Sequence, residues 1–405
     1  MGRVFNLEKL HESFHVQSRK KAPGIDGVRK EHYAVGVEEK LQELSNRIRR
    51  MDYRPEPVRR AYIPKINGGR RPLGIPTFED RIVQDRVAQV LKAIWEPEFR
   101  GCSYGYRPQR SAHDALLAVH RIISQEGTQY VVEADIKGFF NAVSHEHLMR
   151  FLEHRIADPN FLRLIRRYLK AGVMEDGVFN TSEEGTPQGG LISPVLSNIY
   201  LHYTLDLWFE KKFARTCRGK ARLIRFADDF IACFEYQEDA ERYYTEVQER
   251  LAMFLLEIEP SKTKLIPFGL RHSPDQTSTF TFLGFTHYLT RSQKGRTKIG
   301  RKTAGRKFRT KLQEVSERLK RLRTKGTKVM TEFVKAHLRG HINYYGVSEN
   351  SRSVSSYCYQ VRKLLFKWLN RRSNKKSCTW EIFGPWYQRL KMPTPKIVHS
   401  FYSNT

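Results

Sequence analysis

The chain has 405 residues, with 72 Lys and Arg against 43 Asp and Glu, which gives a formal net charge of +29. Its 40% hydrophobic and 28% charged content is typical of soluble globular proteins and argues against a low-complexity chain. At about 150 residues per domain, this length predicts two to three domains.

The positive charge is concentrated in the C-terminal part. Residues 291–405 hold 29 Lys and Arg against 5 Asp and Glu, a net charge of +24, whereas residues 1–290 carry only +5. A basic surface of this size indicates a polyanionic partner, and nucleic acid is the first candidate. An anionic membrane is a weaker candidate, because no strongly apolar helical face or spanning stretch accompanies the basic segments. We therefore expect no membrane partner.

The five cysteines lie at positions 102, 217, 233, 358 and 378, without a Cys-x-x-Cys pair. Their odd number and spacing argue against a disulfide framework and against a zinc knuckle. The first residues also lack the apolar core of a secretory signal. These observations predict reduced thiols and a cytoplasmic location.

In chain order, the first half mixes helices and strands. Helical spacing covers much of residues 1–50, interrupted by a turn-rich loop at 22–27. Residues 58–75 predict two strands around the turn signal Asn67-Gly68-Gly69. Helical patterns follow at 80–95 and, after a capping-box sequence at 111–114, at 115–123. A strand at 131–135 and helices over 144–171 complete this part.

The second half continues with a Gly-rich loop at 185–190 and helices at 193–213 and 237–256. Strands are predicted on either side of Asp228, near Leu265, and at 280–285. From Leu289 onward the composition changes. Residues 291–311 look like a basic, glycine-dotted linker, followed by amphipathic helices with apolar stripes from 308 to 322 and from 354 to 369. The pattern predicts an α+β unit followed by a basic helical unit.

The most informative stretch is Phe226-Ala227-Asp228-Asp229-Phe230, between two short apolar runs. This pattern predicts a β-hairpin with both carboxylates at its tip. On its own, a pair of aspartates in a turn is usually only a turn. However, Asp135 ends another predicted strand, and three converging carboxylates are the arrangement that two divalent metal ions need for in-line phosphoryl transfer.

Several short motifs occur in a specific order. They are Arg70 to Pro76, Tyr104 to Pro108, Ala134 to Phe140, Gly185 to Gly190 with Ser193, Pro194 and Asn198, the aspartate hairpin, Ser261 to Thr263, and Phe282 to Phe285. Over residues 23–285 this series resembles the reverse transcriptases encoded by group II introns, of the bacterial type. Residues 338–345, Leu-Arg-Gly-His-Ile-Asn-Tyr-Tyr, resemble the maturase (X) domain that forms the thumb in that family.

The resemblance implies a role for each matching residue. Asp135, Asp228 and Asp229 would bind two Mg²⁺ ions, or Mn²⁺ in their place, together with the backbone carbonyl of Ile136. Lys262 would be a general acid at the leaving phosphate. The nucleotide would be bound by Lys65, Arg71, Phe140 and Gln188, with Phe140 beneath the sugar and Phe139 in the core. Leu283 and Gly284 would contact primer and template.

The resemblance also implies a right-hand polymerase fold of class α+β. The expected parts are fingers over residues 1–105, a palm over 106–288, a basic helical thumb or X domain over 289–372, and a short tail over 373–405. The expected partners are an RNA template, an intron RNA, a DNA primer or target, and deoxynucleoside triphosphates, and the sequence leaves the oligomeric state open. No Cys-x-x-Cys pairs or HNH-like cluster follow, so we expect no DNA endonuclease domain.

Two alternatives to an intron reverse transcriptase with a maturase role stay open at this point. One is a domesticated relative in phage defence or beside a CRISPR array, and the other is a non-catalytic RNA-binding splicing factor. The chain departs from the usual pattern at Phe226, where Tyr is more common, and at Asn141 and Ser144, where Asp is common. None of the three is an expected metal ligand, so activity is still expected.

Overall fold

The computed structural model describes residues 1–64, 69–175, 177–180, 184–185, 189–274, 278–372 and 378–402. The chain divides into two compact units, each made of segments that are not continuous in sequence. Unit 1 contains Met1–Ala112, Ala134–Ala232 and Glu238–Lys264, and unit 2 contains His113–Glu133, Cys233–Gln237 and Leu265–Thr405. Mixed helices and largely antiparallel strands give the predicted α+β class.

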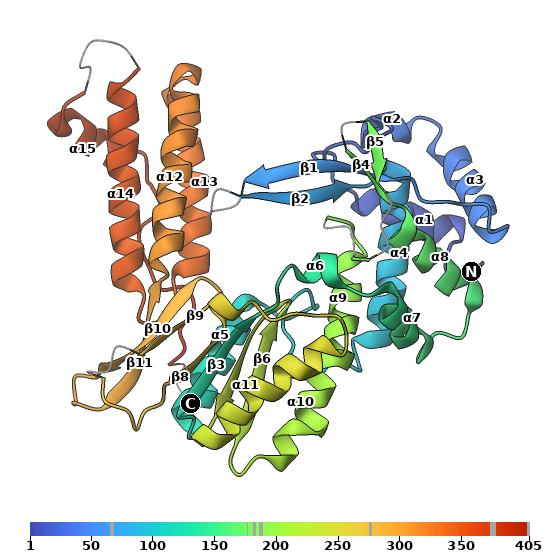
Figure 1. Ribbon diagram of the computed structural model, residues 1–405. Helices are drawn as coiled ribbons and strands as arrows, with labels where there is room; N and C mark the ends of the chain where they lie inside the picture. Colours follow the sequence, from blue (N-terminus) through green and yellow to red (C-terminus); the bar gives the residue numbers. More distant parts are fainter. Residues whose placement is uncertain are drawn as a thin grey trace. The chain divides into compact units, whose positions relative to one another are not determined.

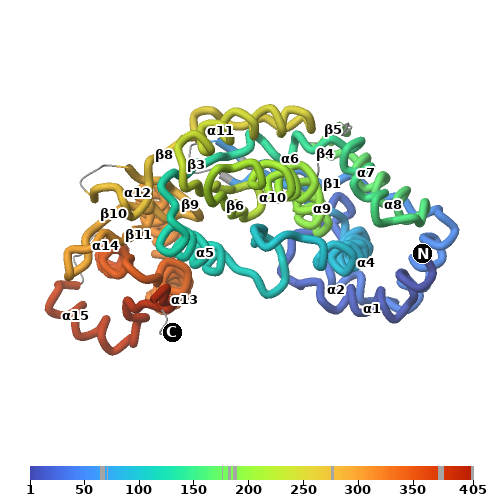
Figure 2. The backbone as a smooth tube through the Cα atoms, turned by 90° about the horizontal axis from the view of Figure 1, so that it is seen from below, coloured from blue at the N-terminus to red at the C-terminus, as the bar shows by residue number. Residues whose placement is uncertain are grey.

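Unit 1 begins with helices that pack around α4 (Figures 1 and 2). Its elements up to the active segment are α1 (Leu7–Val16), α2 (Lys30–Ala34), α3 (Val37–Arg49), β1 (Val58–Pro64), β2 (Arg70–Ile75), α4 (Phe78–Trp95), α6 (Phe139–Ala142), α7 (His145–Glu153), α8 (Pro159–Lys170), β4 (Val173–Glu175) and β5 (Val178–Asn180). Thr77 caps α4 by accepting from the Asp80 backbone, because the first turn of a helix leaves its N–H groups without partners.

The rest of unit 1 carries the aspartate hairpin. Its elements are α9 (Ser193–Leu201), a π-helical turn η1 (His202–Asp206), α10 (Leu207–Lys211), η2 (Phe213–Thr216), β6 (Ala221–Phe226), β7 (Asp229–Phe234), α11 (Gln237–Ala252) and η3 (Pro260–Lys262). The predicted continuous helix over 193–213 is therefore interrupted. A π turn of this kind rotates the side chains that follow it, and such turns are frequent at functional sites.

Unit 2 contains α5 (Ala112–Gln125) and a bundle of α12 (Gly305–Leu322), α13 (Thr327–Tyr345) and α14 (Ser351–Asn370), which run side by side in Figure 1. Its other elements are β9 (Thr279–Phe282), β10 (Phe285–Arg291), β11 (Thr297–Thr303), η4 (Arg323–Lys325) and α15 (Trp380–Arg389). Val315, Leu319 and Leu322 of the predicted apolar stripe are buried.

Within the described residues, the strands form three sheets, ordered β2-β1-β4-β5, β11-β10-β9 and β6-β7-β3-β8. The last of these includes β3 (Tyr130–Asp135) and β8 (Lys264–Pro267). The strands β7 and β3 are neighbours in it, and each has residues in both units. This order brings the strand that begins at Asp229 beside the strand that ends at Asp135.

The prediction of a linker at 291–311 is wrong. Residues 285–303 form an antiparallel hairpin, with Phe285 opposite Thr303 and Arg291 opposite Thr297. Two fully buried side chains of this hairpin, His287 and Arg301, are polar. A search for alternating apolar residues does not detect a strand whose buried positions hold polar side chains.

In the described part of the chain, no helix is both long enough and apolar enough to cross a bilayer. All five cysteines are free thiols.

Candidate active site

The two adjacent aspartates lie where the sequence predicts them, at the tip of a hairpin in unit 1. The strand β6 ends at Phe226, Ala227 and Asp228 form the turn, and Asp229 begins β7. Ala227 has a φ of +58°, in the left-handed region that short hairpin turns require. Both carboxylates are partly exposed, so they are accessible from one end of the sheet.

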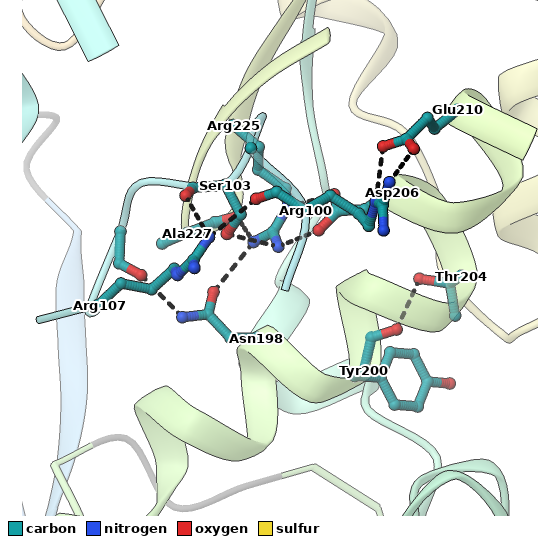
Figure 3. Close-up of polar contacts among 12 residues, drawn as sticks. Arg100, Ser103, Arg107, Asn198, Tyr200, Thr204, Asp206, Glu210, Arg225 and Ala227 are labelled. Atoms are coloured by element: carbon teal, nitrogen blue, oxygen red, sulfur yellow. Dashed lines mark hydrogen bonds and ion pairs between the residues drawn. The ribbon is translucent and has the colours of Figure 1, made fainter. Parts of the chain in front are cut away.

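A buried ion pair between Arg225 and Asp206 supports this turn (Figure 3). The side chains of Arg225 and Asp206 are both 0% exposed and meet in a two-pronged contact, with Nε to Oδ1 at 2.7 Å and Nη2 to Oδ2 at 2.5 Å. Burial alone would lower the pKa of Arg225, but the Asp206 carboxylate outweighs it and raises that pKa. The guanidinium is therefore permanently charged inside the unit.

The remaining donors of Arg225 reach the Ala227–Asp228 turn and the motifs around it. Its Nη1 donates to the Ala227 carbonyl and to Asn198 Oδ1, each at 3.0 Å, and its Nη2 donates to Ser103 Oγ at 2.9 Å. These contacts account for all the N–H directions of the fork. The turn that presents Asp228 is thus fixed by a side chain three residues earlier.

The segment before α5 lies directly along β6. The backbone N–H of Arg225 donates to the Cys102 carbonyl and that of Tyr104 donates to the Arg225 carbonyl, both at 2.8 Å. A Cβ atom on Gly105 would lie 2.4 Å from the Ala227 backbone nitrogen. Only glycine allows this approach, which explains the Tyr-Gly-Tyr motif as a support for the turn.

Asp135 lies at the end of β3, and its backbone is anchored by the loop that follows α11. The Glu259 N–H donates to the Asp135 carbonyl at 2.8 Å, and Ile136 forms an antiparallel bridge with Ile258. The hydrogen bonds of this bridge are made by the residues on either side of Ile136, so its own carbonyl is directed away from Ile258. The use of the Ile136 carbonyl as a metal ligand stays a prediction.

Lys262 lies at the end of η3 in the same anchored loop, and its Nζ donates to Asp135 Oδ2. This hydrogen bond raises the pKa of Lys262, and the charge of Asp228 acts in the same direction. Asp135 and Asp228 therefore both act on one ammonium group, although 93 residues separate them in sequence. The structure thus brings Lys262 to the predicted carboxylates.

The donors in this site are of the type that Mg²⁺ prefers. Asp135, Asp228 and Asp229 offer carboxylate oxygens at the adjoining ends of neighbouring strands, and hard oxygen ligands suit magnesium. Among the described residues, no three His, Cys, Asp or Glu side chains are already grouped as a metal site. The ammonium of Lys262 lies against Asp135 and supplies one positive charge beside the three carboxylates.

Phe139 is buried as predicted, whereas the role of Phe140 beneath the sugar stays a prediction. Phe139 is 2% exposed and Phe140 is partly exposed. They lie in the short helix α6 rather than in a strand, so the turn of the helix, and not strand alternation, separates the two rings. A Cβ atom on Gly185 would lie 2.8 Å from the Phe140 carbonyl oxygen, so the Gly-rich loop starts beside the backbone of α6.

Lys65 and Gln188 lie outside the described residues. Arg71 lies in β2, where its backbone pairs with Ile63 across the hairpin. A Cβ atom on Gly189, the residue after Gln188, would lie 2.7 Å from the Gly74 carbonyl oxygen of β2. The end of the Gly-rich loop therefore contacts the strand that carries Arg71.

Leu283 and Gly284 form the two-residue turn between β9 and β10 in unit 2. Both have positive φ, +51° and +81°, as in the turns that join tightly paired strands. The Tyr344 hydroxyl donates to the Leu283 carbonyl at 2.9 Å, and Tyr345 packs against Gly284. The turn predicted to contact primer and template is thus joined to α13.

A family model matches the part of the chain that contains this arrangement. Residues 63–287 match the model described as "Reverse transcriptase (RNA-dependent DNA polymerase)", and this span includes the aspartate hairpin, Asp135, Lys262 and the Leu283–Gly284 turn. The chain belongs to this reverse transcriptase family.

Similar proteins point to group II introns within the family. The chain is 41% identical to protein YkfC of Escherichia coli over 207 residues, which are 50% of this chain and 53% of YkfC. It is 44% identical to the group II intron-encoded protein LtrA of Lactococcus lactis over 166 residues, 41% of this chain and 27% of LtrA. A 91 kDa protein in the cob intron of Schizosaccharomyces pombe is 38% identical over 170 residues, 42% of this chain and 21% of that protein. The predicted resemblance is confirmed, and the matches span about half or less of each relative.

Sequence reasoning missed Arg225, Asp206 and Ser103, which support the reverse transcriptase turn. The signal was present in part. An arginine inside the apolar run Leu223-Ile224-Arg225-Phe226 occupies a strand position that must be buried, and a buried charge needs a partner. What the sequence did not indicate was where that partner lies.

Proposed function

We propose that the protein is an RNA-directed DNA polymerase of the group II intron type. The observation that carries this proposal is the placement of Asp135 beside the Asp228–Asp229 hairpin, at neighbouring strand ends of a chain that belongs to the reverse transcriptase family. The similarity to LtrA supports the group II assignment over a phage-defence or CRISPR-associated relative.

In this proposal Asp135, Asp228, Asp229 and the Ile136 carbonyl hold two magnesium ions. Such ions would lower the pKa of the primer 3′-hydroxyl and neutralise the charge that develops on the leaving pyrophosphate. Lys262, like lysine in general, is protonated at neutral pH, and in this proposal its Nζ gives a proton to the leaving phosphate. Asp135 positions that ammonium through its Oδ2 atom.

The other roles follow the family pattern and remain proposals. Lys65, Arg71 and Gln188 bind the incoming deoxynucleoside triphosphate, and the partly exposed ring of Phe140 packs beneath its sugar. A ring in that position leaves no room for a 2′-hydroxyl, so it selects deoxynucleotides. Phe226, at the usual Tyr position, changes a nucleotide contact without removing a metal ligand.

The proposed architecture is the right hand, with fingers, palm and thumb at the bounds predicted from the sequence. Leu283 and Gly284 would contact the primer and template. The partners are an RNA template and a DNA primer, and the five free thiols support a reducing compartment such as the cytoplasm.

The deciding experiment is primer extension on an RNA template with Mg²⁺, using Asp228→Ala combined with Asp229→Ala. The natural protein should synthesise cDNA and the double variant should not, with unchanged binding of primer–template. A matched control is Glu238→Ala with Glu249→Ala, two exposed carboxylates on α11 whose removal should leave extension intact. A natural protein that binds the RNA tightly and makes no cDNA would refute the polymerase.

A second function, binding intron RNA and assisting its splicing, is supported by the net charge of +24 over residues 291–405. If splicing depends on binding alone, the aspartate double variant should still support it. Loss of splicing together with polymerisation, with RNA binding intact, would argue against a separate maturase role. Strong splicing without cDNA synthesis by the natural protein would favour a non-catalytic splicing factor.

A further inference from the structure

A basic groove lies on unit 1, and none of the residues that line it is proposed for catalysis. It has a volume of about 440 Å³ and lies between α8, the extended segment before β1, and the β4–β5 hairpin. Among the residues that the structure describes, its charged lining consists of Arg54, Arg163, Arg166, Arg167 and Lys170, without an acidic side chain. The accumulation is local, because residues 1–290 as a whole carry a net charge of only +5.

The helix α8 is responsible for most of this charge. Its residues Phe161, Leu164 and Tyr168 are buried, whereas Arg163, Arg166 and Lys170 are exposed. From Arg163 to Lys170 the helix advances about 10 Å, at 1.5 Å per residue. That length exceeds the rise of about 3.4 Å per nucleotide along a strand, so the row can contact more than one phosphate.

Most of these cations are available to a ligand. Among the described residues, Arg54, Arg163 and Lys170 make no side-chain hydrogen bond or ion pair, and Arg166 has only a 3.9 Å contact to Glu153. Arg167 has a different task, since its Nη1 donates to the Met51 and Tyr53 carbonyls at 2.7 Å each. It fixes the extended segment against α8 and so fixes the width of the groove.

An aromatic ring completes the groove. Phe179 of β5 lines it and is 50% exposed, although a large apolar side chain gains free energy from burial. Its neighbour Val178, on the opposite face of the strand, does not line the groove. An exposed ring beside a row of cations is how proteins bind unpaired nucleotides, with bases stacked on the ring and phosphates on the cations.

A neighbouring cavity on the other side of α8 shows the contrast. It has a similar volume, about 430 Å³, and shares Arg166 and Lys170, but Glu146 and Glu153 also line it. Glu146 is already paired with Arg150 at 2.5 Å. Arg150 lines this cavity as well, but the two carboxylates offset two of its three cationic side chains. It is therefore less complementary to a polyanion than the groove with Phe179.

We propose that the groove formed by Arg54, α8 and Phe179 binds a single-stranded segment of RNA. The choice of RNA rests on the proposed function, in which the template and the intron are RNA. The choice of a single strand rests on Phe179, because a base must leave its stack before it can pack on that ring. The groove is additional to the active site, since none of its residues is assigned to catalysis.

The charge test uses Arg163→Gln, Arg166→Gln and Lys170→Gln together, sparing Arg167. Binding of a labelled oligouridine probe is measured by fluorescence anisotropy over a range of salt concentrations. We expect about tenfold or greater weakening at physiological salt, and a log–log salt slope reduced by up to about 2, at about 0.7 for each single-strand phosphate that the variant no longer neutralises. The matched control removes three exposed charges elsewhere in unit 1, with Lys211→Gln, Lys212→Gln and Arg215→Gln.

Equal weakening by the control triple would overturn the proposal, as would an unchanged affinity. A larger effect on a duplex RNA, or on an oligothymidine of the same length, would overturn the assignment to single-stranded RNA. Because anisotropy measures no synthesis, these outcomes are independent of whether the protein extends a primer.

A photocrosslinking test keeps every charge in place. Benzoylphenylalanine at position 179 should crosslink to oligouridine upon irradiation, whereas the same residue at position 178 should crosslink several-fold less. Equal yields at the two positions would contradict the groove. Crosslinking at position 179 in a protein that makes no cDNA would refute the polymerase and leave the groove standing.

Discussion

Arg225 donates from Nη1 to the backbone carbonyl of Ala227, 3.0 Å away, and so binds the turn that its own strand leads into. The same guanidinium is paired with Asp206 in a fully buried contact. A charged network of this kind contributes little net stability but imposes one geometry on the groups it binds. Here that geometry is the orientation of Asp228 and Asp229.

Removal of one partner of the Arg225–Asp206 pair should lower the free energy of unfolding strongly. Arg225→Met leaves the Asp206 carboxylate buried and unpaired, and we expect a loss of about 3–5 kcal/mol in the free energy of unfolding. Combining Arg225→Met with Asp206→Leu should recover most of this loss, because a buried apolar pair can replace a buried ion pair. Thermal melting of the three proteins measures the difference.

The double variant should nevertheless extend primers poorly, since the Ala227 carbonyl, Asn198 and Ser103 all lose their donor. Primer extension per folded molecule checks this. A stable double variant with natural activity would show that the network does not position the aspartates.

Gly105 offers a backbone test of the same turn. Gly105→Ala would place a Cβ atom 2.4 Å from the Ala227 nitrogen, which belongs to main chain that cannot rotate away. We expect a destabilisation of about 1–3 kcal/mol and a strong loss of cDNA synthesis. Gly101→Ala is the control, because nothing lies within 4 Å of its Cβ position. Equal effects of the two substitutions would contradict the role given to Gly105.

The proposed role of Lys262 predicts a kinetic effect without a binding effect. Lys262→Ala should slow nucleotide addition about 10²–10⁴-fold, the usual contribution of a positioned acid. Lys262→Arg keeps the charge but holds its proton too tightly, so it should give an intermediate rate. Single-turnover extension measures both, and Lys264→Ala, at an exposed position two residues later, is the control. A Lys262→Ala rate equal to the control rate would exclude proton donation by this residue.

The buried carboxyl group of Asp80 should make the free energy of unfolding depend on pH. Burial raises the pKa of Asp80 from 3.8 to about 6 in the folded protein, although the Tyr53 hydroxyl donates to its carboxylate. Because the folded pKa is raised, the contribution to stability is fully present below about pH 4 and is lost as the pH rises through about 6. The loss amounts to about 3 kcal/mol, at 1.36 kcal/mol per pKa unit.

Asp80→Asn should therefore melt at a higher temperature than the natural protein at pH 8, with the advantage shrinking toward pH 4. The control is Asp52→Asn, at an exposed carboxylate, which should show no such trend. A variant that is destabilised equally at both pH values would mean that Asn cannot replace the hydrogen bonds of Asp80.

Local patterns predicted the aspartate hairpin well. Two apolar runs around Ala227-Asp228 specify a hairpin by themselves, and its register is set by a two-residue turn. Asp135 beside it followed from the resemblance, and the strand order confirms that β3 and β7 are neighbours. These features depend on residues close together in sequence or on a motif order.

The supports of the hairpin could not be predicted in the same way. Asp206 reaches Arg225 because a π turn interrupts the helix over 193–213, and a helical periodicity of 3.6 gives no sign of such a turn. His287 and Arg301 hid the β10–β11 hairpin because they are buried and polar. The groove beside α8 depends on Phe179 and Arg54, which only the folded chain brings together.

The turn of Leu283 and Gly284 is bound from two directions. The Tyr344 hydroxyl holds the carbonyl of Leu283, and the Ala304 N–H holds the carbonyl of Gly284, just before α12 begins. A two-residue loop tied to two helices cannot shift by itself. If α12 and α13 tilt when a nucleic acid binds to their basic side chains, this loop must move together with them.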